Sequence, residues 1–172
     1  MIQKCSLWKV VEIFFKEPTK IHYIREISRN INLAPTSVKK HILDLLKQDF
    51  IIKKKELFIG YSANLENENF IFHKRISNQI NIKTSGLLKY LIDNTHPETI
   101  ILYGSYSRGE DREHSDIDLF ILTKNSKQLN LEKFEKELKR EIHIIIEKDS
   151  RNLNPNLREN LKNGFVIYGY LK

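Results

Sequence analysis

Apolar residues in the first third of the chain recur at intervals of three and four positions, the spacing typical of amphipathic helices. This spacing occurs within residues 7–14, 24–31 and 38–46, and Pro35 suits the first position of the third helix. We therefore predict three helices before residue 49. The apolar positions that support this prediction are Leu7, Val10, Val11, Phe14, Ile24, Ile27, Ile31, Val38, Ile42, Leu45 and Leu46.

Two short apolar runs follow, at residues 50–52 and 57–59, on either side of three lysines. Runs of this length are typical of strands, so we expect a hairpin here. Three helices followed by a hairpin resemble a winged helix-turn-helix domain, which we assign to residues 1–62.

The third helix of such a domain fits the major groove of DNA. If this helix buries its apolar side, its polar side chains face outward, where hydroxyls and lysines can bind phosphates. We therefore predict that the domain binds double-stranded DNA, with docking of a protein or dimerisation as the alternative. The predicted nucleic-acid-binding residues are Thr36, Ser37, Lys39, Lys40, Lys53, Lys54 and Lys55.

Residues 63–95 are predicted to form a helical linker. Ser85 and Gly86 separate two helical stretches, and a clear apolar stripe follows them. This stripe predicts a last helix that packs on the second domain. Its residues are Leu87, Leu88, Leu91 and Ile92.

A second domain, assigned to residues 96–172, begins with a β-branched run that is too short for a helix and suits a buried strand. Gly104 and Ser105 follow as a turn, and a polar stretch, of which residues 110–113 are interpreted as a solvated loop, leads to a second strand. The predicted elements of this domain are strands at 99–103 and 117–122, a helix at 131–138, a strand at 141–147, a short helix after Asn154 and a strand at 165–170.

Asp116 and Asp118 stand two residues apart at the start of the second strand, so their side chains project to one face of the sheet. Ile117 points to the opposite, buried face. Paired carboxylates suit Mg²⁺, which keeps waters and substrate phosphates as its other ligands. The missing side chain of Gly104 lets backbone N–H groups and the Ser105 hydroxyl approach phosphate oxygens. These residues indicate a site for magnesium and for the phosphates of a nucleotide.

The sequence LYGSYSRGEDREHSDIDLFIL, residues 102–122, resembles the signature of the polymerase-β-like nucleotidyltransferase superfamily. It is similar to the minimal nucleotidyltransferase branch, which includes archaeal proteins with an N-terminal winged helix. The resemblance is strong over residues 97–147 and weaker outside them. It implies an α+β protein in which a winged helix-turn-helix domain precedes a small mixed β-sheet flanked by helices.

The resemblance implies transfer of a nucleoside monophosphate from an NTP to a hydroxyl, with release of pyrophosphate. In such two-metal transfer the ions stand about 3.5–4 Å apart and clamp the attacking and leaving oxygens. Arg108 either steadies the charge of the triphosphate or pairs with Glu110 or Asp111. The residues implied are Gly104 and Ser105 for the triphosphate, and Asp116 and Asp118 for Mg²⁺ or Mn²⁺.

Active members of the family carry a third carboxylate on a later strand, where it helps to bind metal and activates the acceptor hydroxyl. His143 stands at the aligned position, two residues after Glu141 and on the same face of the strand. Glu141 is therefore the predicted third catalytic residue, with Glu147 as the alternative. If neither carboxylate reaches the metals, catalysis is weak or absent.

The distribution of charge agrees with a nucleic-acid partner for the first domain. The net charge is +7; residues 1–60 carry 12 Lys and Arg against 6 Asp and Glu, whereas residues 96–172 carry 13 of each kind. No apolar run approaches the roughly 20 residues needed to cross a bilayer, and the chain does not start like a signal peptide. Cys5 is the lone cysteine, so no intramolecular disulfide is expected. These features predict a cytoplasmic protein without a membrane partner.

The sequence therefore supports two functions. The first is a Mg²⁺-dependent nucleotidyltransferase that modifies a hydroxyl of protein or RNA and binds DNA through its winged helix. The second is a DNA-binding transcriptional regulator or antitoxin, in which a catalytically weak nucleotidyltransferase fold only binds nucleotide or a partner. The resemblance also brings a toxin-like protein partner, because minimal nucleotidyltransferases act as antitoxins that modify a toxin.

Overall fold

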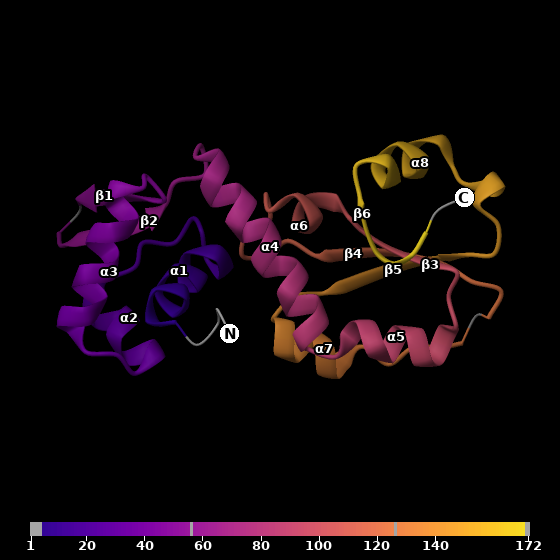
Figure 1. The fold of residues 1–172 in the computed structure, drawn as a ribbon, viewed down its shortest axis with the longest axis horizontal. Coiled ribbons are helices and arrows are strands. Elements are labelled where there is room, and N and C mark those ends of the chain that lie inside the picture. The colour runs from indigo at the N-terminus through magenta and orange to yellow at the C-terminus, as the bar shows by residue number, and fades with distance from the viewer. Residues whose placement is uncertain (1–4, 56, 126, 171–172) are drawn as a thin grey trace. The chain divides into compact units, whose positions relative to one another are not determined.

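The computed structural model describes residues 5–55, 57–125 and 127–170. The chain divides into two compact units, residues 1–74 and residues 75–172 (Figure 1). The boundary falls within one continuous helix, α4 (Glu68–Thr84). Residues 63–95, which we predicted as a linker, are therefore shared between the two units: Phe70 lies in the core of the first and Ile82 in the core of the second.

The first unit contains three helices followed by a two-stranded antiparallel sheet. Its elements are α1 (Ser6–Lys16), α2 (Ile24–Ile31), α3 (Pro35–Lys47), β1 (Ile51–Lys55) and β2 (Ile59–Ala63). The predicted apolar stripes meet in one core, so the helical periodicity located these helices correctly. The core residues contributed by the three helices are Val10, Val11, Phe14, Phe15, Ile27, Val38, Ile42 and Leu45.

The hairpin is displaced from its predicted position along the chain. The three lysines at 53–55 lie within β1 and not between the strands, and β2 begins only at Ile59. Leu57 and Phe58 precede β2 and are 96% and 74% exposed. The prediction was wrong here because it assigned apolar residues to a strand, whereas these two side chains lie outside the ladder.

The second unit is built on a four-stranded mixed sheet of strand order β5-β4-β3-β6. β4 and β5 are parallel, and both other pairs are antiparallel. An α+β fold with a small mixed sheet flanked by helices was predicted and is confirmed for this unit. Its elements after α4 are α5 (Leu87–Thr95), β3 (Thr99–Tyr103), α6 (Gly104–Arg108), β4 (Ile117–Leu122), α7 (Glu132–Leu138), β5 (Ile142–Glu147), η2 (Ser150–Asn152), α8 (Pro155–Lys162) and β6 (Phe165–Gly169).

Each face of this sheet has its own core. Alternate residues of the strands point to opposite faces, so Ile117 and Leu119 pack beneath α5 and α7, as predicted for the first of them. Phe120 and Leu122 pack on the other face against Leu161 of α8. Figure 1 shows α8 on one side of the sheet and α5 and α7 on the other. Because Asp118 shares the face of Phe120, the candidate site belongs to the α8 face.

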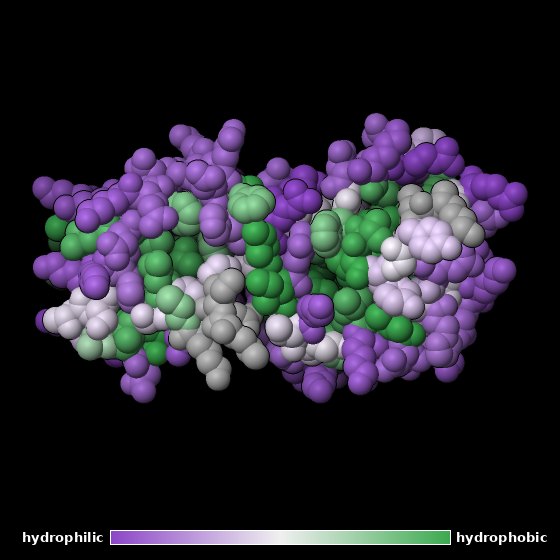
Figure 2. All heavy atoms as spheres, in the orientation of Figure 1, coloured by the Kyte–Doolittle hydropathy of each residue, from purple (hydrophilic) through white to green (hydrophobic). Residues whose placement is uncertain are grey.

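The edge strand β6 leaves apolar side chains at the surface. Gly164 lets this strand approach β3 closely, because a Cβ at residue 164 would lie 2.6 Å from Cγ2 of Ile101. Phe165 and Val166 are 38% and 41% exposed, and Figure 2 shows apolar side chains over β6.

Among the helices that the structure describes, none has both the length and the hydropathy of a segment that crosses a bilayer.

Candidate active site

Asp116 and Asp118 stand at the start of the central strand β4. Asp118 is the second residue of β4 and pairs with Tyr103 on β3, and Asp116 immediately precedes the strand. Their spacing of two residues places both carboxylates on the α8 face of the sheet. Both residues are half-buried, and Tyr103 and Gly104 lie next to Asp118.

Gly104 is in direct contact with the Asp118 side chain. Its φ of +72° is a left-handed conformation that favours glycine. A Cβ on this residue would overlap with Oδ2 of Asp118. Residues 104–108 form the short helix α6 and not the simple turn that we predicted. The glycine therefore serves two needs, the positive φ and the space that the carboxylate occupies.

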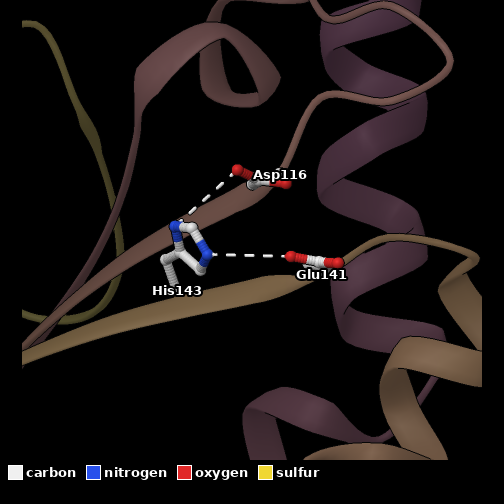
Figure 3. A group of neighbouring side chains, drawn as sticks. All are labelled: Asp116, Glu141 and His143. Carbon is white, nitrogen blue, oxygen red and sulfur yellow. Dashed lines mark ion pairs between the residues drawn. The ribbon is translucent and has the colours of Figure 1, made fainter.

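The neighbouring strand β5 brings His143 to the same place. In the parallel ladder His143 is the register partner of Asp118. Figure 3 shows its imidazole between two carboxylates: Nδ1 lies 3.7 Å from Oδ2 of Asp116, and Nε2 lies 4.0 Å from Oε2 of Glu141. Glu141 immediately precedes β5 and accepts a backbone hydrogen bond from Ile117 at 2.9 Å. Four polar side chains from two adjacent strands thus share one end of the sheet.

Burial and neighbouring charges set the protonation of Asp118. Burial raises the pKa of its carboxyl above the usual value of 3.8; the charge of Asp116 also raises it, while His143 and Arg108 act in the opposite direction. Burial, and then the charge of Asp118, raise the pKa of Tyr103. The ionised form of Asp118 is therefore held at a cost, which an added positive charge would relieve.

The predicted triphosphate-binding residues lie beside this carboxylate. Gly104 and Ser105 open α6, and Ser105 is half-buried. Arg108 ends the helix and donates from Nε to Oε2 of Glu110 at 2.7 Å, with both side chains about half exposed. An exposed pair of this kind is weak, so the guanidinium can exchange Glu110 for a phosphate. The structure shows the pair with Glu110, and binding of the triphosphate by Arg108 stays a prediction.

Asp116, Glu141 and His143 are placed to share a cation. One ligand atom from each lies within 4.8 Å of the other two. Two carboxylate oxygens and an imidazole nitrogen form a donor set that fits a divalent cation. Asp118 is not in this group; it faces Gly104 instead. The predicted pair of metal ligands therefore has two different surroundings.

Asp111 is buried, which the sequence did not indicate. We had interpreted residues 110–113 as a solvated loop, but Asp111 is only 1% exposed. Nδ2 of Asn78, on α4, donates to Oδ1 of Asp111 at 2.7 Å and to the carbonyl of Tyr106 at 2.9 Å. Arg140, just before β5, reaches Oδ2 of Asp111 at 3.5 Å. The positive charge of Arg140 and the hydrogen bond from Asn78 offset the cost of burying the Asp111 carboxylate.

This buried network fixes the connection that leads to Asp116. Asn78→Ala is expected to lower the free energy of unfolding by about 2 kcal/mol, because it removes the buried donor that Oδ1 of Asp111 and the carbonyl of Tyr106 share. Urea denaturation of the full chain measures the loss. Asn81→Ala, on the same helix but at a half-exposed position, is the control and should cost much less. Equal stability of the two variants would contradict the proposed importance of the network.

A pocket of about 550 Å³ opens next to Asp116 and Glu141. It lies between the connection that precedes β4 and helix α7. Acidic and basic side chains both line it, so it suits a polar substrate group and not an apolar ligand. The lining residues are Glu113, His114, Ser115, Asp116, Glu132, Glu135, Lys136, Lys139, Arg140 and Glu141.

The predicted nucleic-acid-binding residues lie in the first unit, on α3 and β1. Thr36, Lys39 and Lys40 are exposed on α3, and Ser37 is half-buried. His41, on the same helix, is half-buried, with Nε2 2.9 Å from the Ser6 hydroxyl. All three lysines at 53–55 are exposed on β1. Binding of DNA by these residues stays a prediction.

Residues 86–170 match the family described as "Polymerase beta, Nucleotidyltransferase". The matched residues include all four strands of the sheet and helix α6. They also include Asp116, Asp118, Glu141 and His143. The second unit therefore contains a polymerase-β-like nucleotidyltransferase domain. The match leaves the first unit uncovered.

Other comparisons add little. A crystal structure of a "putative nucleotidyltransferase" from Sulfolobus solfataricus is 18% identical in sequence, with 55% of this chain and 86% of that chain covered. The TM-score of 0.33 is too low to support an argument about the present chain. No curated protein matches this chain in sequence.

Proposed function

We propose that the second unit is a divalent-cation-dependent nucleotidyltransferase that transfers a nucleoside monophosphate from an NTP to a hydroxyl of a protein or an RNA. The observation that carries this proposal is the contact between Asp118 and Gly104, with Asp116 two residues away on the same face. In the family, the same residue types bind metal and triphosphate. The site thus combines candidate ligands for a metal with candidate ligands for a triphosphate, and nucleotidyl transfer needs both.

The reaction exchanges a phosphoanhydride bond of the NTP for a phosphoester bond to the acceptor. The acceptor oxygen bonds to the α-phosphorus, the bond between that phosphorus and the bridging oxygen breaks, and pyrophosphate leaves with the electron pair. A bound divalent cation would offset the charge that develops on the phosphate oxygens. Gly104 and Ser105 hold the triphosphate, and Arg108 releases Glu110 to bind it. Asp116 and Asp118 would hold the cation.

Glu141 is proposed to take the proton from the acceptor hydroxyl. Its side chain is 81% exposed and lines the pocket beside Asp116. An acceptor that enters this pocket would lie beside Glu141. A general base must lie within hydrogen-bond reach of the proton that it removes, and the exposed side chain has the freedom to do so.

One observation favours the second function, a regulator or antitoxin that binds nucleotide without turnover. His143, and not a carboxylate, is the register partner of Asp118 on β5. If the Glu141 side chain points into the pocket and does not bind metal, Asp116 and Asp118 are the only two carboxylate ligands among the site residues named here, and catalysis is weak. The two functions share the nucleotide site and differ in whether transfer occurs.

Incubation of the full chain with α-labelled NTPs distinguishes these two functions. The mixtures contain Mg²⁺ or Mn²⁺ and candidate acceptors, both protein and RNA. Label that becomes attached to an acceptor supports the enzyme. Metal-dependent NTP binding without transfer to any acceptor supports the regulator. Absence of both NTP binding and transfer would contradict both functions.

For the first unit we propose binding to double-stranded DNA. Support comes from the exposed hydroxyl and lysines of α3, the exposed lysines of β1 and the excess positive charge of residues 1–60. The order of three helices and a hairpin agrees with a winged helix. A protein partner, such as a toxin that the second unit modifies, is the alternative occupant of this surface.

The double variant Lys39→Ala/Lys40→Ala is expected to bind duplex DNA about tenfold more weakly at low salt, because each lysine that contacts phosphate releases counterions. The slope of log affinity against log salt should also become shallower by about one per lysine. Fluorescence anisotropy with a labelled duplex measures both quantities. The control, Lys83→Ala/Lys89→Ala, makes the same change in charge at exposed positions of α4 and α5. No affinity of the wild-type chain for duplex would defeat the claim.

A further inference from the structure

The donor atoms at the start of β4 and β5 differ from those that magnesium prefers. Mg²⁺ takes oxygen ligands and retains waters, whereas an imidazole nitrogen suits transition metals. Here His143 occupies the point on β5 that is in register with Asp118. A nitrogen donor therefore stands where an oxygen donor would complete an all-oxygen site.

His143 is placed as a ligand and not as a packed residue of the sheet. Its side chain is 59% exposed, and each ring nitrogen faces a carboxylate, at 3.7 Å for Asp116 and 4.0 Å for Glu141. Figure 3 shows that the three side chains point toward one another. None of the three is held by burial, since Asp116 is 38% and Glu141 81% exposed. Small rotations can therefore bring their donor atoms around one ion.

From this geometry we infer that His143, with Asp116 and one carboxylate oxygen of Glu141, makes the site select a first-row transition cation over Mg²⁺. The second oxygen of Glu141 keeps its proposed role as base. Mn²⁺ is the probe of choice, because it accepts carboxylate ligands as Mg²⁺ does and, as a transition ion, also coordinates imidazole. The inference rests on the proposed function, because it names the cation of that same site. It adds a role for a residue that the resemblance leaves without one.

The variant that tests this is His143→Asp, which restores an all-oxygen donor set at an exposed position. Isothermal titration of the full chain with Mn²⁺ and with Mg²⁺, without nucleotide, gives both affinities. The wild-type chain should bind Mn²⁺ at least about 100-fold more tightly than Mg²⁺, and the substitution should reduce this ratio about tenfold or more. His96→Asn, an exposed histidine that follows α5, is the control and should leave the ratio unchanged.

Electron spin echo spectroscopy of bound Mn²⁺ provides an independent readout. Coupling to an imidazole nitrogen should be present in the wild-type chain and in His96→Asn, and absent in His143→Asp. A wild-type spectrum without nitrogen coupling would overturn the inference, and so would equal Mn²⁺-to-Mg²⁺ ratios in wild type and His143→Asp.

Neither readout depends on turnover, so the failure of the inference and that of the proposed function are distinguishable. Nitrogen-ligated Mn²⁺ without nucleotidyl transfer would sustain the inference and remove the enzyme. Transfer supported equally by Mg²⁺, with no nitrogen coupling, would sustain the enzyme and overturn the inference.

Discussion

Asp118→Asn is expected to lower the rate of nucleotidyl transfer at least about a thousandfold, equivalent to about 4 kcal/mol of transition-state stabilisation. The substitution keeps the shape of the side chain but removes the charge that would hold a cation next to Gly104. Transfer of α-label from NTP to the acceptor, followed under single-turnover conditions, measures this loss. A variant that retains a tenth of the wild-type rate would exclude Asp118 as a metal ligand.

The same variant should be slightly more stable than the wild-type chain at neutral pH. Because the pKa of Asp118 is raised in the folded state, the folded chain holds this proton more tightly than the unfolded chain does. This contribution to stability is present below pH 3.8 and is lost as the pH rises through the raised value. Asparagine avoids that loss, so the variant should be the more stable of the two at pH 7, and the difference should vanish near pH 3. Asp93→Asn, at an exposed position of α5, is the control for both readouts.

Gly104→Ala is expected to lower nucleotidyl transfer about a hundredfold or more, because the new methyl group would occupy the place of Oδ2 of Asp118 and push the carboxylate away. The displaced atom ends a flexible side chain, so the clash itself should cost little stability. The positive φ should cost about 1 kcal/mol in the free energy of unfolding. Transfer assays and urea denaturation measure the two effects separately.

Gly86→Ala is a closely matched control for this prediction. Gly86 has a φ of +79°, and a Cβ there would meet nothing within 4 Å. Both alanine variants therefore share the backbone penalty, and only the one at residue 104 disturbs Asp118. If both variants transfer nucleotide equally well, the contact between Gly104 and Asp118 has no catalytic importance.

Local patterns in the sequence predicted most of the elements. Helical spacing located α1 to α3, and the β-branched run at 99–103 located β3. The two-residue period also placed Asp116 and Asp118 opposite the buried Ile117. These predictions succeeded because a helix or strand that is buried on one face has apolar residues at the period of that element.

Features that depend on distant residues could not be predicted in this way. Asp111 stands in a polar run, and its burial depends on Asn78 and Arg140, which are 33 and 29 residues away. The different surroundings of the two site carboxylates also escaped prediction. Asp118 faces Gly104 across one strand pair, while Asp116 faces His143 across another. Only the order and register of the strands determine these neighbours.

The position of His143 was predicted only in part from the sequence. Its alignment with the usual carboxylate was predicted, and its pairing with Asp118 in the β4–β5 ladder agrees with that alignment. Its place between Asp116 and Glu141 was not predicted, because a strand pattern gives the face of a side chain but not the direction of its ring. The metal preference that we infer rests on this second fact.

The most direct test of nucleotidyl transfer compares NTP labelled at the α-phosphate with NTP labelled at the γ-phosphate, in one reaction with the full chain, a divalent cation and the acceptor. We expect the α-label to become attached to the acceptor, the γ-label to leave in pyrophosphate in equal amount, and both products to disappear with Asp116→Asn/Asp118→Asn. Attachment of the γ-label to the acceptor, or undiminished transfer by the double variant, would contradict a nucleotidyltransferase site at Asp116 and Asp118.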